Sequence, residues 1–179
     1  MKKVKYRYYM DYEKEEQWVN DMALQGWHLK KFKFIRFTFV QGEPGAYIYR
    51  NELLKGLASK EENDYLEFLK ESGIEVINKS GVWAYFRKKS SDGPFEIYTD
   101  TASKVLYLNR IISLFIFLIL INLLAGISNL ILSGNGSDYG LVSSTIGLWG
   151  VAVAFIILIP TIKVYRRKKE LKEQQNLFD

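Results

Sequence analysis

Two long uncharged segments constrain the fold of this chain more than any other feature. From Ile111 to Leu132 the sequence reads IISLFIFLILINLLAGISNLIL, and a second apolar run extends from Gly140 to Ile162. About 20 apolar residues suffice for a helix to cross a bilayer. We therefore predict a two-helix transmembrane hairpin, with spans at residues 111–132 and 140–162 and an extracytoplasmic turn at residues 133–139. The alternative, two core helices of a soluble protein, is disfavoured because so small a chain cannot enclose two fully apolar helices.

Basic residues near the ends of these segments predict their orientation. Lys104 and Arg110 precede the first span, and five basic residues follow the second: Lys163, Arg166, Arg167, Lys168 and Lys169. Because cytoplasmic flanks carry an excess of Lys and Arg, both termini are predicted to be cytoplasmic. In the tail, residues 163–179, the run Arg166–Lys169 is predicted to contact lipid headgroups, although a plain positive-inside anchor explains the same charges.

Small and polar residues recur at helical spacing within both spans. The first span carries Asn122, Gly126 and Asn129, and the second carries Ser143, Gly147, Gly150 and Ala154. Small residues allow helices to approach closely, so the two stripes are predicted to pack the hairpin together or to form a dimer. An ion or substrate path would require ionisable residues inside the spans, and the two runs contain none.

The first 100 residues predict a cytoplasmic α+β domain. Asp11 is a candidate N-cap of a helix that ends at Gly26, and Ser59 with Glu62 forms a capping box for a second helix that ends at Gly73. The predicted strands are residues 4–10, 27–40, 46–50, 74–78, 82–88 and 95–100, with a hairpin between the second and the third. Trp18 to Gly26 and Tyr65 to Gly73 have the same spacing.

This order of elements favours one particular architecture. A βαββαβ succession with an additional strand is typical of a ferredoxin-like layer of two helices on an antiparallel sheet. A juxtamembrane helix at residues 101–110 is predicted to continue into the first span. If it does, movement of the domain is mechanically coupled to the hairpin.

Residues that carry chemistry are scarce. Cysteine is absent and His28 is the only histidine, so no metal site and no thiol nucleophile is predicted. The carboxylates cluster in the first turns of the two helices, where the helix dipole favours them. No phosphate-binding glycine loop is present. We predict no catalytic residue and no cofactor, and retain a membrane-bound enzyme with an unplaced carboxylate site as an alternative.

Aromatic residues suggest a binding face on the predicted sheet. They comprise Trp27, Phe32, Phe34, Tyr47, Tyr49, Trp83 and Tyr85, interleaved with Lys and Arg. Such a face can stack nucleic-acid bases. However, residues 1–104 carry 18 Lys and Arg against 16 Asp and Glu, so nucleic acid is not an expected partner. The alternative is a core on one face and a ligand or dimer contact on the other.

Several motifs together resemble a known family. They are WVNDMALQGWHLKKFKF, YIYR, YLEFLKESGIEVI, VWAYFRKK and FEIYTDTASK. Their order and spacing over residues 1–104 are similar to the bacterial domain of unknown function family 2812. The resemblance implies attachment to a bacterial cell membrane and a gene neighbourhood with PadR-type transcriptional regulators. It implies no activity and assigns no functional residues.

The sequence therefore predicts a bacterial membrane protein that acts as a sensor, adaptor or accessory protein. Its cytoplasmic domain is expected to bind another protein or a second copy of the chain, and its hairpin to contact membrane lipids. A small-ligand-binding domain is the alternative from a different class, beside the enzyme mentioned above.

Overall fold

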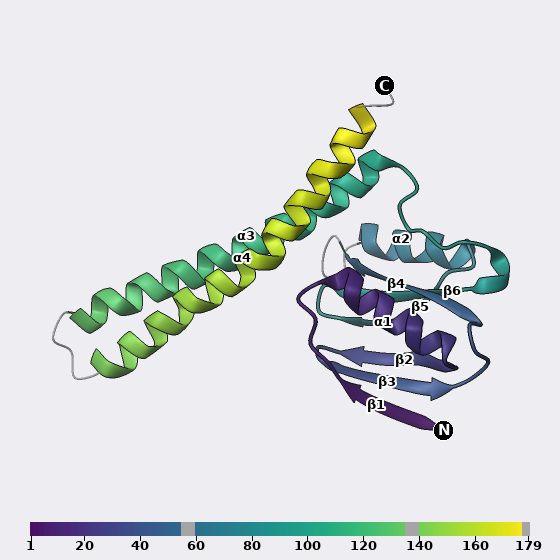
Figure 1. Ribbon diagram of the computed structural model, residues 1–179, viewed down its shortest axis with the longest axis horizontal. Helices are drawn as coiled ribbons and strands as arrows, with labels where there is room; N and C mark the ends of the chain where they lie inside the picture. The colour runs from purple at the N-terminus through teal and green to yellow at the C-terminus, as the bar shows by residue number, and fades with distance from the viewer. Residues whose placement is uncertain (55–59, 135–139, 177–179) are drawn as a thin grey trace. The chain divides into compact units, whose positions relative to one another are not determined.

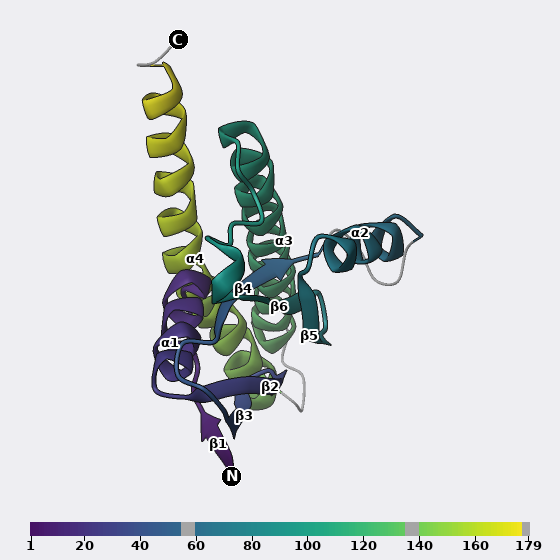
Figure 2. The ribbon, with the colours of Figure 1, turned by 90° about the vertical axis from the view of Figure 1, so that its right-hand side faces the viewer.

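A computed structural model describes residues 1–54, 60–134 and 140–176. The chain forms two compact units, Met1–Ile97 and Tyr98–Asp179. The first is an α+β domain and the second consists of two long helices, as predicted. Figures 1 and 2 show both units.

The α+β domain contains two three-stranded antiparallel sheets of the same topology. Sheet A has the order β1-β3-β2, and sheet B the order β4-β6-β5. The elements of the first half are β1 (Lys2–Tyr6), α1 (Tyr12–Leu24), β2 (Trp27–Lys33) and β3 (Arg36–Gln41); those of the second half are β4 (Tyr47–Leu53), α2 (Lys60–Glu71), β5 (Glu75–Ser80) and β6 (Trp83–Lys89). Each half is therefore a βαββ unit.

The two βαββ units of the domain form a tandem repeat. Adding 47 to the number of a residue in the first βαββ unit gives its counterpart in the second. Gly26 and Gly73 end the two helices with φ of 78° and 76°. A register shift falls after Leu29 in β2 and after its counterpart Val76 in β5. The equal spacing of Trp18–Gly26 and Tyr65–Gly73 in the sequence thus marks a repeat of whole βαββ units.

Three details of the predicted sheet were wrong. Residues 27–40 form two strands, because the chain reverses at Phe34, where φ is 53°. Residues 41–45 are not a hairpin turn, since β3 and β4 belong to different sheets. Residues 95–100 form no strand; they follow the short 3-10 helix Ser90–Asp92 as irregular chain. The ferredoxin-like strand order is accordingly not observed.

Local signals place both helices of the domain. The Asp11 side chain accepts a hydrogen bond from the Glu13 amide at 3.2 Å, confirming the predicted N-cap. After α2, the Gly73 amide donates to Lys70 and the Ile74 amide donates to Leu69. This exit needs a left-handed residue, which explains Gly73. Ser59 of the predicted capping box lies outside the described residues.

Two hydrophobic cores lie on opposite faces of sheet B. The first contains residues of α1 and of both sheets: Val19, Met22, Ala23, Leu29, Phe32, Phe37, Phe39, Tyr49 and Tyr85. The second contains Leu54, Leu69, Ile74, Ala84, Phe86 and Phe95. Along β6, Tyr85 points into the first core and its neighbours Ala84 and Phe86 into the second, as strand pleating requires. Helix α1 contacts β4 of sheet B and β2 of sheet A, and Figure 1 shows α2 beyond sheet B.

The second unit contains α3 (Thr101–Gly134) and α4 (Gly140–Asn176). The Asp100 side chain accepts from the Ser103 amide at 2.8 Å and begins α3. The predicted juxtamembrane helix and first span are one continuous helix, and residues 163–176 continue α4. Both helices are long and apolar enough to cross a membrane, and only 11% of the most apolar stretch of either is buried. The predicted turn beyond Gly134 lies outside the described residues.

Candidate functional site

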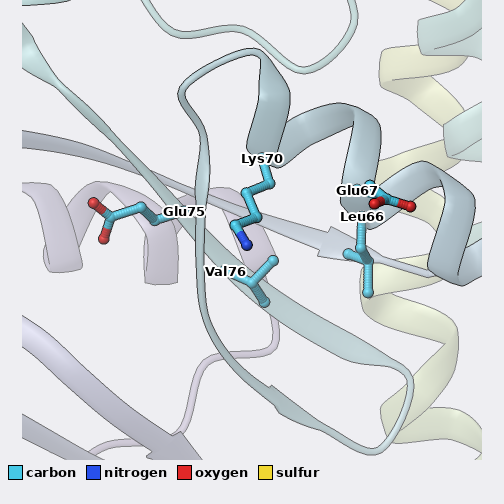
Figure 3. A pocket seen from close by; sticks show the side chains of 5 residues that line it. All are labelled: Leu66, Glu67, Lys70, Glu75 and Val76. Carbon is cyan, nitrogen blue, oxygen red and sulfur yellow. The ribbon is translucent and has the colours of Figure 1, made fainter.

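A groove of about 480 Å³ lies between α2 and β5 (Figure 3). It is lined by Leu66, Glu67 and Lys70 of the helix and by Glu75 and Val76 of the strand. Leu66 and Lys70 are four residues apart and so share one side of α2. Gly73 reverses the chain between them and β5, which sets the strand beside the helix. The groove is therefore built by one helix–strand connection.

Charge is unevenly distributed in this groove. The Glu75 carboxylate accepts two hydrogen bonds from the Arg87 guanidinium, at 2.8 and 2.6 Å. In Figure 3 it points away from Lys70, whose ammonium group lies near Val76. Glu67 lies at the rim and is exposed. The groove thus offers an apolar floor, Leu66 and Val76, next to a cation.

The first βαββ unit contains the counterpart of this groove, and there strand β4 occupies it. The five lining residues correspond to Val19, Asn20, Ala23, His28 and Leu29 of the first unit. There, strand β4 covers the space: the Asn20 side chain accepts from the Tyr49 amide at 2.8 Å and donates to the Tyr49 carbonyl at 2.9 Å. His28 Nδ1 lies 3.2 Å from the Tyr49 hydroxyl. A groove of this kind therefore binds an extended strand within the same domain.

One helix face supplies the backbone contacts to β4. Besides Asn20, the Glu16 carboxylate accepts a hydrogen bond from the Asn51 amide at 2.9 Å. The counterparts of Glu16 and Asn20 in α2 are Asn63 and Glu67, the same two residue types in reverse order. Both are exposed. Helix α2 thus presents an acid and an amide at the positions where α1 holds the backbone of a strand.

The segment after β6 does not take the place that β4 takes after β3. Phe95, which follows β6, is 2% exposed and packs into the core below α2 together with Leu69 and Phe86. Among the residues that the structure describes, the groove is lined by α2 and β5 alone. The second repeat therefore completes its core with Phe95, and within the described residues no strand covers the face of α2 that corresponds to the β4-contacting face of α1.

A polar network joins α1 to sheet B on the other side of the domain. The Tyr85 hydroxyl donates to Glu15 at 2.8 Å, and Arg50 forms an ion pair with Glu16 at 3.2 Å. Burial raises the pKa of both Glu15 and Glu16 above its ordinary value. Burial, and next the Glu15 charge, raises the pKa of Tyr85 well above its usual range. These carboxylates serve the α1–β4–β6 contact.

The raised pKa of Glu15 predicts a pH-dependent stability. Glu15 holds its proton more tightly in the folded state than in the unfolded state. Its contribution to the unfolding free energy is therefore fully present below the pKa of unfolded Glu15, about 4.3, and is lost as pH rises through the pKa of folded Glu15. We expect Glu15→Gln, which keeps an acceptor for Tyr85, to weaken the fall in unfolding free energy between pH 5 and 8. Urea unfolding at several pH values measures the slope of the unfolding free energy against pH for each variant. The exposed Asp21→Asn is the control for loss of a charge; an unchanged slope in Glu15→Gln would contradict the assignment.

The predicted aromatic face does not exist as one surface. Phe32, Tyr49 and Tyr85 are at most 5% exposed and belong to the first core, so they cannot take part in an exposed face. Three others are partly buried against that core: Trp27, Tyr47 and Trp83. Phe34 alone of the seven is exposed, at 74%.

Glycines lie where α3 and α4 cross. A Cβ added at Gly147 would be 2.8 Å from the Gly126 carbonyl oxygen, and one at Gly150 would be 3.0 Å from the Asn122 carbonyl oxygen. Ala154 is 3% exposed. The amides of Asn122 and Asn129 each donate to a carbonyl of their own helix, of Leu118 and Ala125 respectively. Ser143 is half-buried. The small residues thus meet, whereas both Asn side chains hydrogen-bond within α3.

The remaining predicted positions are accounted for separately. Arg166, Arg167, Lys168 and Lys169 lie on the last turns of α4, where Lys169 pairs with Glu173 at 3.6 Å. His28 is 4% exposed, and its Nε2 lies 2.7 Å from the Glu43 carbonyl oxygen. Within the described parts of the chain, no three His, Cys, Asp or Glu side chains gather as a metal site would require.

Sequence reasoning missed the groove residues. Glu67, Lys70 and Glu75 were not singled out, because surface charges on a helix and an edge strand carry no signal by themselves. The equal helix spacings pointed to the repeat, and aligning the two units at Gly26 and Gly73 would have paired Glu67 with Asn20.

Comparison with known proteins assigns a family but no activity. A family model described as "Protein of unknown function (DUF2812)" matches residues 11–120. The match confirms the resemblance noted in the sequence, although it begins at residue 11 and extends into α3. No curated protein and no solved structure matches the chain.

Proposed function

The chain belongs to the DUF2812 family of proteins of unknown function, and from that premise we propose that it is a membrane-anchored adaptor. In this proposal, α3 and α4 cross the cell membrane with both chain termini in the cytoplasm. The domain of residues 1–97 binds an extended segment of a partner protein in the groove between α2 and β5. The occupied counterpart of this groove between α1 and β2 carries the proposal.

The composition of the two long helices supports the membrane anchor. Apolar side chains are exposed along them, among them Phe117 at 58%, Leu124 at 67% and Phe155 at 65%. Water would solvate this surface poorly, whereas lipid tails would cover it. Basic residues flank the apolar stretches at Lys104 and at Lys163, which favours a cytoplasmic position for both ends.

The contacts within the first repeat support one mode of partner binding. Asn20 and Glu16 hold the backbone of β4, so Glu67 and Asn63 are expected to hold the backbone of an extended partner segment. Peptides commonly bind in this way, with main-chain hydrogen bonds for affinity and side-chain pockets for specificity. An apolar partner residue would contact Leu66 and Val76, and an acidic one would meet Lys70.

Site-specific photocrosslinking tests this function. We expect a benzophenone amino acid at Glu67, in the full chain produced by its native bacterium, to yield a cross-linked product of defined mass. The double substitution Lys70→Glu and Val76→Lys should reduce this product at least about tenfold, since it moves the cation from position 70 to position 76 and places a charge on one of the two residues of the apolar floor. Both altered residues are exposed, so the fold should persist; circular dichroism of the purified variant checks this.

The control position is Glu61, which is exposed in the first turn of α2 and does not line the groove. A benzophenone there should give no comparable product. Equal cross-linking from Glu61 and Glu67, or a product that survives the double substitution, would refute the proposed groove. Peptide mapping of the product would then show which surface the partner contacts.

A further inference from the structure

Phe34 occupies a conformation that its side chain disfavours. Its φ is 53°, and it is the only residue other than glycine with a positive φ among the described residues. The counterpart in the second repeat is Gly81, with φ of 63°. In both units the turn lies between paired flanking residues, Lys33 with Arg36 and Ser80 with Trp83. The first repeat thus carries an exposed phenylalanine in a turn that a glycine would form without strain.

Other apolar side chains surround Phe34 at this end of sheet A. Ile35 is 36% exposed and Tyr6 is 65% exposed. The Arg7 amide donates to the Ile35 carbonyl at 2.8 Å, so the chain leaving β1 runs beside the turn. We call Tyr6, Lys33, Phe34, Ile35 and Arg36 the tip of sheet A.

The charge of sheet A is entirely positive. Its strands contain Lys2, Lys3, Lys5, Lys30, Lys31, Lys33 and Arg36, and no Asp or Glu. Tyr6 pairs with Arg36, which pairs with Lys33, so these three side chains share one face. The apolar turn is therefore flanked by cations on an exposed face.

We propose that the tip of sheet A docks on the anionic membrane surface, with Phe34 and Ile35 inserted among the lipid headgroups. Exposed aromatic and aliphatic side chains beside Lys and Arg are the combination by which proteins bind anionic bilayers peripherally. Two cations flank the turn directly, and Lys5 and Lys31 add to the positive potential. An acidic protein surface would also complement these charges, but binding to it would not explain the exposed phenylalanine at the strained turn position 34.

The chain's own geometry favours the bilayer as the occupant. The domain ends at Ile97 and the uncharged stretch begins at Ile111. This connection reaches at most about 50 Å when extended, and less because α3 begins at Thr101. The tip is thus held near the membrane at high effective concentration, where weak insertion suffices. The inference rests on the proposed membrane insertion of α3, and not on the groove beside α2.

Fluorescence from single labels tests the docking. The chain has no cysteine, so Ile35→Cys can carry one nitrobenzoxadiazole label in full-length protein reconstituted into vesicles. We expect blue-shifted emission and quenching by headgroup-region lipid quenchers in phosphatidylglycerol-containing vesicles, and less of both in pure phosphatidylcholine. Lys33→Glu with Arg36→Glu should lower the docked-to-free ratio at least about tenfold. Phe34→Gly should weaken docking while preserving the fold, since Gly81 forms the same turn.

Two further label positions separate the outcomes. Val82→Cys, at the half-buried counterpart of Ile35 in the second repeat, should give the same emission in both kinds of vesicle and no headgroup quenching. Leu118→Cys, within the apolar stretch of α3, should be quenched in every vesicle by lipids that carry the quencher on their acyl chains, because this position would lie in the hydrocarbon region. If position 118 is quenched while position 35 behaves like position 82, docking of the tip is refuted and the anchor stands. If position 118 is not quenched, the membrane anchor fails, and the docking proposal fails with it.

Discussion

Replacing Phe37 by alanine should lower the unfolding free energy of the domain by about 3–5 kcal/mol. Phe37 is fully buried in the first core. Its ring meets Trp18 edge-on at 5.1 Å between centroids and lies 5.9 Å from Phe32. Truncation would remove these contacts and leave a cavity between α1 and sheet A. Urea unfolding in mild detergent, followed by tryptophan fluorescence, measures the loss, because three of the four tryptophans lie in this unit: Trp18, Trp27 and Trp83.

Phe34→Ala is the matched control. It removes the same side chain three residues earlier in the sequence, but at a position that is 74% exposed. The expected change is within about 0.5 kcal/mol, as for other surface substitutions. Similar losses from both variants would mean that Phe34 is also buried in solution. That result would overturn both the assignment of the core and the membrane-docking tip.

Gly147→Leu should force α3 and α4 apart. A Cβ at this position would lie 2.8 Å from the Gly126 carbonyl oxygen and 2.7 Å from Cγ of Leu130. Since the first of these is backbone, the helices must separate or shift to accept a side chain, at a cost of at least about 1–3 kcal/mol. In lipid, close packing is a principal source of helix association. Few other interactions would therefore hold α3 and α4 together once this packing is lost.

Dipolar spectroscopy between spin labels would report this separation. Cysteines introduced at the exposed Leu124 and Leu148 place one label on each helix near the crossing. We expect a longer and broader distance distribution in Gly147→Leu than in the native hairpin. Gly134→Leu is the control, because a Cβ there meets nothing within 4 Å. An unchanged distribution in Gly147→Leu would show that the two helices do not cross at these glycines in the bilayer.

The features that could be predicted from the sequence depend on local interactions. Asp11 caps α1 through an amide two residues away, and Gly26 and Gly73 end their helices because each adopts a left-handed conformation. The two apolar stretches were recognisable because crossing a bilayer requires only length and composition. The helix predicted at residues 101–110 is also placed by a local signal, since the Asp100 side chain accepts a hydrogen bond from the Ser103 amide.

The aromatic face failed because the sheet face that these residues share is part of the first core: Tyr49 and Tyr85 follow strand alternation and are buried there. In β2 the alternation is also interrupted. Leu29 and Phe32 are three residues apart in β2, and simple alternation would place them on opposite faces. Both are nevertheless buried in the first core, since a bulge after Leu29 shifts the register. The corresponding shift after Val76 in β5 has the same effect on its side chains. No pattern in the residue types reveals where such a bulge falls.

The sequence by itself determined the division into an α+β domain and two long apolar helices, the ends of α1 and the helix-ending glycines. Only the tertiary structure decided that β3 and β4 enter different sheets, that β4 covers the groove beside α1, and that the groove beside α2 stays open. The first group depends on hydrogen bonds and burial within a few residues. The second depends on which distant strand best satisfies Asn20 and Glu16, a choice among partners that are remote along the chain and meet only when the domain is folded.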